Sequence, residues 1–188
     1  MVHVFNMIKL KDLICEVKNV VYPYGCIMAY INNEDKQKIL KFNKELIDND
    51  IIYNNKKKEF GRELEPHVTI KYGLTETYTW EEMNIMVGDI SPFTIILEKT
   101  SIFQNEEYDV IKINADGKEL KQLNKKFCKL PNEDKYLEYH PHCTLAYVKK
   151  GEGTKFKNKG EEMSCLINEI VYSDNGKKYY YKLKDKKK

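Results

Sequence analysis

The stretch His67-Val68-Thr69-Ile70-Lys71-Tyr72 has a pattern that returns as His142-Cys143-Thr144-Leu145-Ala146-Tyr147. This repeat indicates that the fold is built around two matching strands. Both stretches read His-x-Thr-apolar-x-Tyr. Side chains alternate between the two faces of a strand, so the first, third and fifth residues of each stretch share one face. The second, fourth and sixth residues, tyrosine included, form an opposite face that can pack under a helix. Two such strands, side by side or across a groove, would bring two imidazoles and two hydroxyls around one small volume.

The residues around each motif predict the same order of elements. Apolar runs and alternation predict strands at 25–31, 93–103, 108–113, 164–172 and 178–183, in addition to the two motif strands. Helical spacing of apolar residues predicts helices from 33 to about 49, from Thr79, and from Asp116 to Pro131. Each half thus presents a strand, a helix and then a His-x-Thr strand, which looks like an internal duplication in architecture.

Composition limits the class of protein. The chain has 188 residues, 41% hydrophobic and 32% charged, which predicts one domain or two close-packed lobes and excludes a disordered polymer or a membrane protein. Its net charge of +3 is only mildly basic, and much of the excess lies in the tail 182–188. The five cysteines are odd in number, form no C-x-x-C pair and follow no signal peptide, so we expect a reduced cytoplasmic setting.

Paired histidines indicate acid/base chemistry at a phosphodiester. With an unperturbed pKa near 6.5, a neutral imidazole can take a proton from the attacking oxygen while a protonated one gives a proton to the leaving oxygen. The threonine hydroxyls can donate hydrogen bonds to the phosphate between them. The sequence contains no H-x-x-x-H pair, C-x-x-C pair or P-loop. We therefore expect neither a metal nor a cofactor.

The strings Pro66-His67-Val68-Thr69-Ile70 and Pro141-His142-Cys143-Thr144-Leu145 resemble the two H-x-[ST]-φ motifs of the 2H phosphoesterase superfamily, which includes LigT-like 2′-5′ RNA ligases and 2′,3′-cyclic phosphodiesterases. The similarity in the order of elements runs from about residue 24 to residue 183. It implies a bilobal α+β fold, with two pseudo-twofold-related lobes of antiparallel sheet, outer helices and a central catalytic groove. The corresponding division of a single domain, 1–188, is lobes 24–90 and 91–172, a final strand 178–184 and a basic tail 185–188.

The resemblance also implies an activity. It predicts a metal-independent phosphodiesterase that cleaves cyclic or short ribonucleotides, with His67, Thr69, His142 and Thr144 as catalytic residues. The flanking sequences look most like the phage-type branch, which includes the anti-CBASS nucleases that destroy cyclic oligonucleotide signals of bacterial antiviral defence. A phage protein of this kind would act in the host cytoplasm. We expect a monomer that needs no membrane and no protein partner, with a cyclic or linear oligoribonucleotide as its substrate.

Other functions stay open at this point. RNA end processing, as a 2′,3′-cyclic phosphodiesterase or a 2′-5′ RNA ligase, would use the same residues, and ligation would run the same chemistry in reverse. A nucleotide-binding module without turnover is the alternative from another class, and the intact His and Thr of both motifs argue against it. Sequence does not assign which histidine is the base and which is the acid.

Further candidates for substrate binding are Lys71, Tyr24 and Phe103. Lys71 is on the His67 face by alternation, where it would contact phosphate, but an exposed strand end fits the sequence equally well. Aromatic rings at the groove rim could stack on a base, and the candidates are Tyr22, Tyr24, Tyr30, Phe103 and Tyr108. Alternation turns Tyr72 and Tyr147 away from the histidines, so both are expected to serve in packing rather than in base stacking.

Overall fold

The computed structural model describes residues 24–54, 60–134 and 138–185. Within them lie seven strands, β1 (Gly25–Ile31), β2 (His67–Leu74), β3 (Phe93–Gln104), β4 (Tyr108–Asp116), β5 (His142–Lys149), β6 (Met163–Asp174) and β7 (Lys177–Lys182). The helices are α1 (Asn33–Leu46), α2 (Trp80–Val87) and α3 (Lys118–Phe127), with short 3-10 turns η2 (Asn49–Ile51) and η3 (Glu152–Phe156). Tyr22 and tail residues 186–188 lie outside the described part of the chain.

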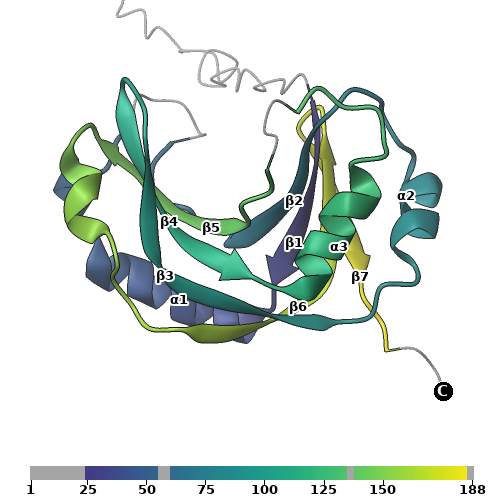
Figure 1. Ribbon diagram of the computed structural model, residues 1–188, viewed down its shortest axis with the longest axis horizontal. Helices are drawn as coiled ribbons and strands as arrows, with labels where there is room; N and C mark the ends of the chain where they lie inside the picture. Colours follow the sequence, from purple (N-terminus) through teal and green to yellow (C-terminus); the bar gives the residue numbers. More distant parts are fainter. Residues whose placement is uncertain (1–23, 55–59, 135–137, 186–188) are drawn as a thin grey trace, which may run out of the picture.

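Every strand pairing is antiparallel, and the strands form one seven-stranded sheet in the order β1-β2-β5-β4-β3-β6-β7. An additional pairing between β1 and β6 closes six of these strands into a ring. The two sides of this ring rise as the arms of a U in Figure 1, with β3 and β4 in one arm and β1 and β2 in the other, and β7 lies outside the ring beside the second arm. The expected α+β fold with two lobes is confirmed.

The lobes are not consecutive pieces of the chain. The long strand β6 pairs with β1 over residues 26–31 and with β7, so the end of the chain completes the sheet of the first lobe. The start of β3 pairs with the start of β6 and thereby ties the lobes together at their base. The expected division at residue 90 therefore does not separate the two lobes, because β6 follows residue 90 but pairs with β1, which precedes it.

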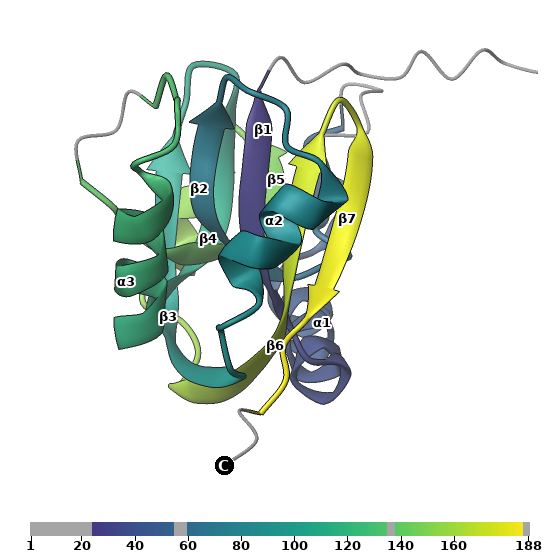
Figure 2. The same ribbon diagram turned by 90° about the vertical axis from the view of Figure 1, so that its right-hand side faces the viewer.

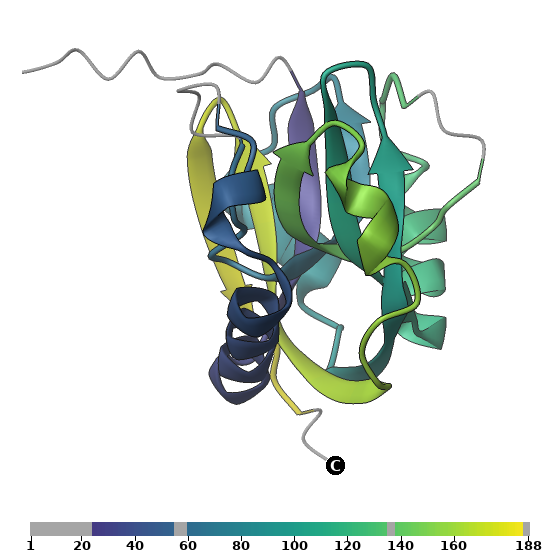
Figure 3. The same ribbon diagram turned by 90° about the vertical axis from the view of Figure 1, so that its left-hand side faces the viewer.

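Helices cover the outer surfaces of the sheet. Figure 2 shows α2 and α3 on one side of the molecule, and Figure 3 shows α1 and η3 on another. The capping box expected at the start of α2 is present, since Thr79 Oγ1 accepts from the Glu82 backbone N–H and Glu82 accepts from that of Thr79. Leu120, Leu123 and Phe127 of α3 are buried against the sheet, so the helical spacing seen in the sequence packs α3 against the core.

The first motif strand contains a β-bulge directly after its threonine. Thr69 pairs with Met28 of β1. Lys71 pairs with the preceding residue of β1, Ile27, so Ile70 is an extra residue in β2. A bulge of this kind reverses the alternation of the side chains that follow it.

The second motif strand contains a bulge at the same place. Thr144 pairs with Lys112 of β4, whereas Ala146 pairs with the preceding residue, Ile111. Leu145 is therefore the extra residue of β5 and corresponds to Ile70 of β2. The match between the bulges is structural support for the pseudo-twofold relation of the two motif strands.

These bulges correct the simple alternation expected from the sequence. Lys71 does not share the face of His67, because the bulge turns its side chain inward, where it is only 4% exposed. Tyr147 does not turn away from His142, since the two residues line one cavity. Tyr72 packs against the ring of Tyr24, with the centroids 6.0 Å apart, although its side chain is exposed.

Candidate active site

The histidines and threonines of the two motifs line one cavity of about 590 Å³. Strands β2 and β5 meet at a single antiparallel pair, Val68 and Cys143, the residues between His and Thr in each motif. Continuing this register places each motif histidine across from the threonine of the other motif. Side chains directly across an antiparallel pair have Cβ atoms about 5 Å apart. The four side chains thus alternate around the floor of the cavity as imidazole, hydroxyl, imidazole and hydroxyl.

Both imidazoles are held in the same way by the backbone. His67 Nδ1 lies 2.7 Å from the carbonyl oxygen of Glu65, and His142 Nδ1 lies 2.9 Å from the carbonyl oxygen of His140. A carbonyl oxygen only accepts hydrogen bonds, so each Nδ1 carries a proton and donates it. Nε2 is then the nitrogen that each ring has available for a substrate. This arrangement supports acid/base use of both Nε2 atoms.

The charged groups around His67 in the first lobe balance each other. The ring of Tyr30 stacks on it with the centroids 5.5 Å apart. Lys178 Nζ, from β7, donates to Tyr30 Oη at 2.9 Å and to the Glu65 carboxylate at 2.5 Å. The hydrogen bond from Lys178 holds the pKa of Glu65 below its ordinary value, and burial raises the pKa of Tyr30 to about 12. The ammonium beside His67 therefore has a carboxylate to balance it.

His142 lies beside a buried ammonium of the second lobe. Phe103 meets the imidazole edge to face, with the centroids 5.1 Å apart, and Lys112 Nζ lies 4.4 Å from the centroid of the Phe103 ring. Lys112 donates to Ser101 Oγ at 2.7 Å and to Asn114 Oδ1 at 3.0 Å. Its side chain is 6% exposed, and no carboxylate of the described residues lies within ion-pairing distance of it.

Burial and nearby charge change the protonation of this pair. Burial lowers the pKa of His142, and the positive charges of Lys112 and His67 lower it further, against the hydrogen bond to the His140 carbonyl, which raises it. Burial also lowers the pKa of Lys112. His142 is therefore biased toward the neutral imidazole that a general base requires.

Of Lys71, Tyr24 and Phe103, only Phe103 contacts a motif histidine, and Tyr30 from the wider set of aromatic candidates stacks on His67. Lys71 Nζ forms an ion pair with Asp134 at 2.9 Å, and Tyr24 Oη donates to Glu133 at 2.7 Å. Both residues are thereby attached to the loop that follows α3, and neither lines the cavity. The bulge at Ile70 is the physical reason for the position of Lys71.

Several cavity residues were not selected from the sequence. They come from the segment before the first motif, from the end of β5 and from the last hairpin, and are Phe60, Glu63, Glu65, Tyr147 and Lys178. Tyr108, one of the aromatic candidates for base stacking, also lines the cavity. Strand pairing brings these residues together from distant parts of the chain, and only their closeness to a motif could have indicated Glu63 and Glu65.

No group of three or more His, Cys, Asp or Glu side chains in residues 24–54, 60–134 and 138–185 is arranged to hold a metal ion. No helix in this part of the chain has the length and apolar character needed to cross a lipid bilayer. Metal independence stays a prediction for a chelator experiment.

Comparison with known proteins identifies the fold. No protein-family model and no curated protein matches the sequence. Among solved structures, E. coli LigT complexed with ATP is 16% identical, with a TM-score of 0.57 over 88% of this chain and 99% of that chain. Kluyveromyces marxianus Usb1 is 9% identical, with a TM-score of 0.55 over 86% of this chain and 98% of that chain.

A third structure, described as a phosphoesterase, is 15% identical, with a TM-score of 0.57 over 87% of this chain and 99% of that chain. These neighbours are 2H phosphoesterases. The ring of antiparallel strands around the doubled His-x-Thr motif is therefore the 2H phosphoesterase fold.

Proposed function

We propose that this protein is a phosphodiesterase that cleaves ribonucleotides by paired-histidine acid/base catalysis. The observation that carries the proposal is the alternating floor of the cavity, in which both histidines have Nδ1 bound to a backbone carbonyl and Nε2 available. A phosphate on this floor accepts hydrogen bonds from the hydroxyls of Thr69 and Thr144. Both imidazoles are then beside the reacting oxygens.

The different surroundings of the histidines support a division of roles between them. His142, with its lowered pKa, takes the proton of the ribose 2′-hydroxyl at Nε2. The 2′-oxygen attacks the phosphorus, and the bond to the 5′-oxygen of the next nucleoside breaks. His67 gives the proton of its Nε2 to that leaving oxygen. The products are a 2′,3′-cyclic phosphate and a free 5′-hydroxyl, and water in place of the 5′-hydroxyl opens the cyclic phosphate with the two roles exchanged.

Structures of fold neighbours with nucleotides support a nucleotide substrate. E. coli LigT has been solved with ATP and with 3′-AMP, and Kluyveromyces marxianus Usb1 with uridine monophosphate. The cavity of this chain offers hydroxyls and imidazoles for a phosphate and aromatic rings for a base. All four cysteines of the described residues are free thiols, which supports a reducing, cytoplasmic place of action.

A substrate panel tests the proposal. The wild-type chain is incubated with a 3′-5′ dinucleoside monophosphate, a 2′-5′ isomer, a 2′,3′-cyclic mononucleotide, and cyclic di- and trinucleotides, and the products are separated by chromatography. We expect cleavage of at least one substrate with and without EDTA, and none by the His67→Ala and His142→Ala variants. Cleavage that survives in both variants, or requires a metal, would contradict the mechanism.

The same panel separates the finer functions. Selective opening of cyclic di- or trinucleotides supports an anti-CBASS nuclease of phage type, whereas selective action on 2′,3′-cyclic ends supports RNA end processing. Joining of a 2′,3′-cyclic end to a 5′-hydroxyl end is the test for ligation. Binding without any product would instead support the non-catalytic module. Size-exclusion chromatography with light scattering tests the expected monomer.

A further inference from the structure

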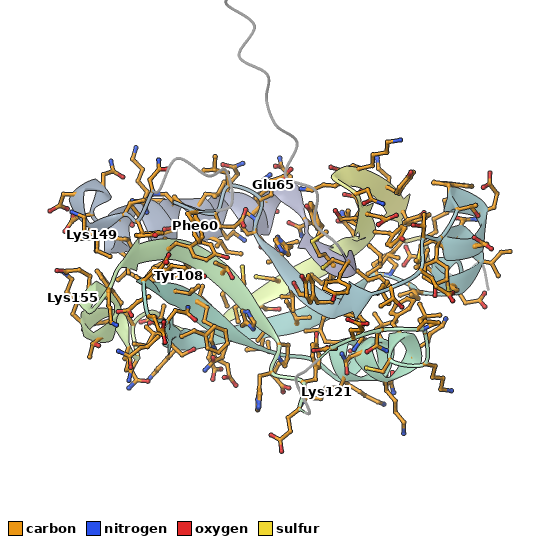
Figure 4. All side chains as sticks on the ribbon, turned by 90° about the horizontal axis from the view of Figure 1, so that it is seen from above. Phe60, Glu65, Tyr108, Lys121, Lys149 and Lys155 are labelled. Carbon is orange, nitrogen blue, oxygen red and sulfur yellow. The ribbon has the colours of Figure 1, made fainter. Side chains whose placement is uncertain are left out.

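Beside the catalytic floor, three aromatic rings form what we call the aromatic recess: Phe60, Tyr108 and Tyr147. Their centroids are 5.0 to 5.5 Å apart, with Tyr53 behind them at 5.2 Å from Phe60 and 5.3 Å from Tyr108. Each recess ring is half-buried and lines the same cavity as the motif histidines. Figure 4 shows Phe60 and Tyr108 together over the second lobe. Part of each ring therefore remains uncovered by protein next to the phosphate position.

The backbone fixes the recess before any ligand arrives. Gly61 O accepts from Tyr147 N at 2.8 Å, and Glu63 N donates to Leu145 O at 2.8 Å, so the segment that carries Phe60 is attached to the edge of β5. The guanidinium of Arg62 binds the carbonyl oxygens of Asn43 and Ile47, each at 2.7 Å, and joins this segment to the end of α1. Rings held in this way need no ordering on binding, which favours affinity.

The chemistry of the recess suits a nucleobase. Flat rings bind the face of any base by stacking, with little dependence on sequence. The rest of the cavity is polar, because the catalytic hydroxyls and imidazoles, Glu63, Glu65 and Lys178 form it. An aliphatic ligand would leave these groups without hydrogen bonds. A base joined through its ribose to a phosphate on the floor can stack on the aromatic rings while the phosphate accepts hydrogen bonds from the polar groups.

A lysine continues this surface outward. Lys149 lies two residues beyond Tyr147 on β5 and pairs across the sheet with Tyr108, so it shares their face. It is exposed, and no ion pair joins it to a carboxylate in residues 24–54, 60–134 and 138–185. Figure 4 shows it farther from the centre of the molecule than Tyr108. The order is therefore phosphate floor, aromatic recess and cation.

We propose that the aromatic recess binds the nucleobase next to the scissile phosphate and that Lys149 binds the phosphate beyond it. The substrate class is then an oligoribonucleotide with at least two phosphates, linear or cyclic, and an isolated 2′,3′-cyclic mononucleotide fills only part of the site. This inference rests on the proposed function for the position of the scissile phosphate. Binding measured without turnover tests it separately.

The base subsite is tested by fluorescence titration in the His142→Ala background, with a dinucleoside monophosphate that carries 2-aminopurine and with the abasic analogue of the same compound. We expect Phe60→Ala and Tyr147→Ala to raise the Kd of the 2-aminopurine probe by about tenfold to a hundredfold, and to leave the Kd of the abasic analogue within twofold. Tyr72→Ala, at the position of β2 that corresponds to Tyr147, is the matched control and is expected to change neither Kd. Phe60→Leu provides an apolar replacement without an aromatic face, should Phe60→Ala fold poorly.

Equal Kd values for parent and recess variants would overturn the base subsite, and so would an equal loss with the abasic analogue. If the wild type cleaves nothing in the substrate panel but the recess variants lose binding, the proposed function fails and the subsite stands. If cleavage occurs but the recess variants bind normally, the subsite fails and the proposed function stands.

The phosphate subsite is tested with probes that carry or lack a terminal phosphate at either end. Lys149→Ala is expected to raise the Kd of a phosphorylated probe by about threefold to tenfold and to reduce its salt slope by about 0.7, with no effect on the unphosphorylated probe. Lys121→Ala is the control, since Lys121 lies at the lower edge of the molecule in Figure 4, away from Lys149 at the left edge. An equal effect of Lys149→Ala on all probes, or an equal effect of Lys121→Ala, would overturn this subsite.

Discussion

The two motif strands share a backbone, but the surroundings of their histidines differ in charge. In the first lobe, the ammonium of Lys178 near His67 is balanced by the carboxylate of Glu65. In the second lobe, the ammonium of Lys112 near His142 is buried among a phenyl ring and neutral oxygens. A pseudo-twofold backbone can therefore hold two identical imidazoles and still place them in different electrostatic surroundings. This difference, rather than the motif itself, supports a division into base and acid.

The largest effect is expected when either histidine is removed. His67→Ala and His142→Ala should each lower kcat by about 10²- to 10⁴-fold, the usual contribution of a positioned acid or base. Both variants should keep the far-UV circular dichroism and melting temperature of the wild type, because neither imidazole is part of the apolar core. A double variant that is no slower than the single variants would show that the two groups act as a unit. Unequal losses in the single variants would sharpen the comparison of the lobes.

Substitution of the two threonines tests whether both lobes donate equally strong hydrogen bonds to the phosphate. Thr69→Val and Thr144→Val keep the shape of the side chain and remove one hydrogen-bond donor each. A hydrogen bond to a charged group is worth about 1.5 to 3 kcal/mol, so kcat/KM should fall by about tenfold to a hundredfold in each variant. Thr69→Ser and Thr144→Ser should restore most of the rate. A loss in only one valine variant would mean that phosphate lies nearer to one lobe.

Sequence alone was sufficient for most of the fold, and it singled out the two motifs that the fold brings together. The repeated His-x-Thr pattern, the helix that begins at Thr79 and the final hairpin around residues 174–176 could be predicted because each is determined by local residues. Helix α1 ends at Leu46 rather than near Asn49, where η2 follows, and β4 continues to Asp116 beyond the expected end at Ile113. Errors of this size are usual at element ends, where tertiary contacts decide between neighbouring residues.

The bulges at Ile70 and Leu145 could not be predicted, and they decide which residues reach the cavity. A bulge depends on how two strands pair, which is not encoded in the alternation of one strand. Lys112 and Lys178 were missed for a similar reason, since each reaches a histidine from a different strand. The pairing of strands decides which charged side chains lie near each histidine. A single sequence does not show this pairing.

Substitution of Lys112 tests the effect of the unbalanced ammonium on His142. Lys112→Met should raise the pKa of His142, because removal of a nearby positive charge favours the imidazolium, while burial still acts in the opposite direction. The base must be neutral, so the acidic limb of the kcat/KM profile should move to higher pH, with a loss of at most about fourfold at pH 6, because burial still keeps the pKa below the ordinary value. The pKa is measured by titration of the imidazole resonances in NMR spectra.

Charged groups from every side of His142 enter this experiment. Lys112 faces His142 from β4 and His67 faces it from β2, while His140 lies just before β5. The charge of each of these residues lowers the pKa of His142. Lys178→Met is the control, because the charges that lower the pKa of His142 are those of Lys112, His67 and His140, and it should leave the His142 titration in place. If Lys112→Met leaves the pKa of His142 and the pH profile unchanged, the lobes do not differ in the way proposed here.

The smallest effect on activity is expected from the residue that follows each bulge. This position holds Lys71 in β2 and Ala146 in β5, and both are buried. Lys71→Met should keep kcat/KM within about threefold, because Lys71 binds Asp134 and does not line the cavity. It should lower the free energy of unfolding by about 1 to 3 kcal/mol, less than a fully buried pair would lose, since the Asp134 side chain is 17% exposed.

Urea denaturation followed by circular dichroism measures the stability of this variant, and the double variant Lys71→Met/Asp134→Leu shows how much of the loss comes from the carboxylate left without its ammonium. Recovery of stability in the double variant is expected, because an apolar pair of similar size can replace a buried ion pair. A large fall in kcat/KM with unchanged stability would mean instead that Lys71 contacts the substrate phosphate. The position after the bulge would then be structural in the second lobe and functional in the first, and the asymmetry of the two lobes would extend from the charge around the histidines to the motif strands themselves.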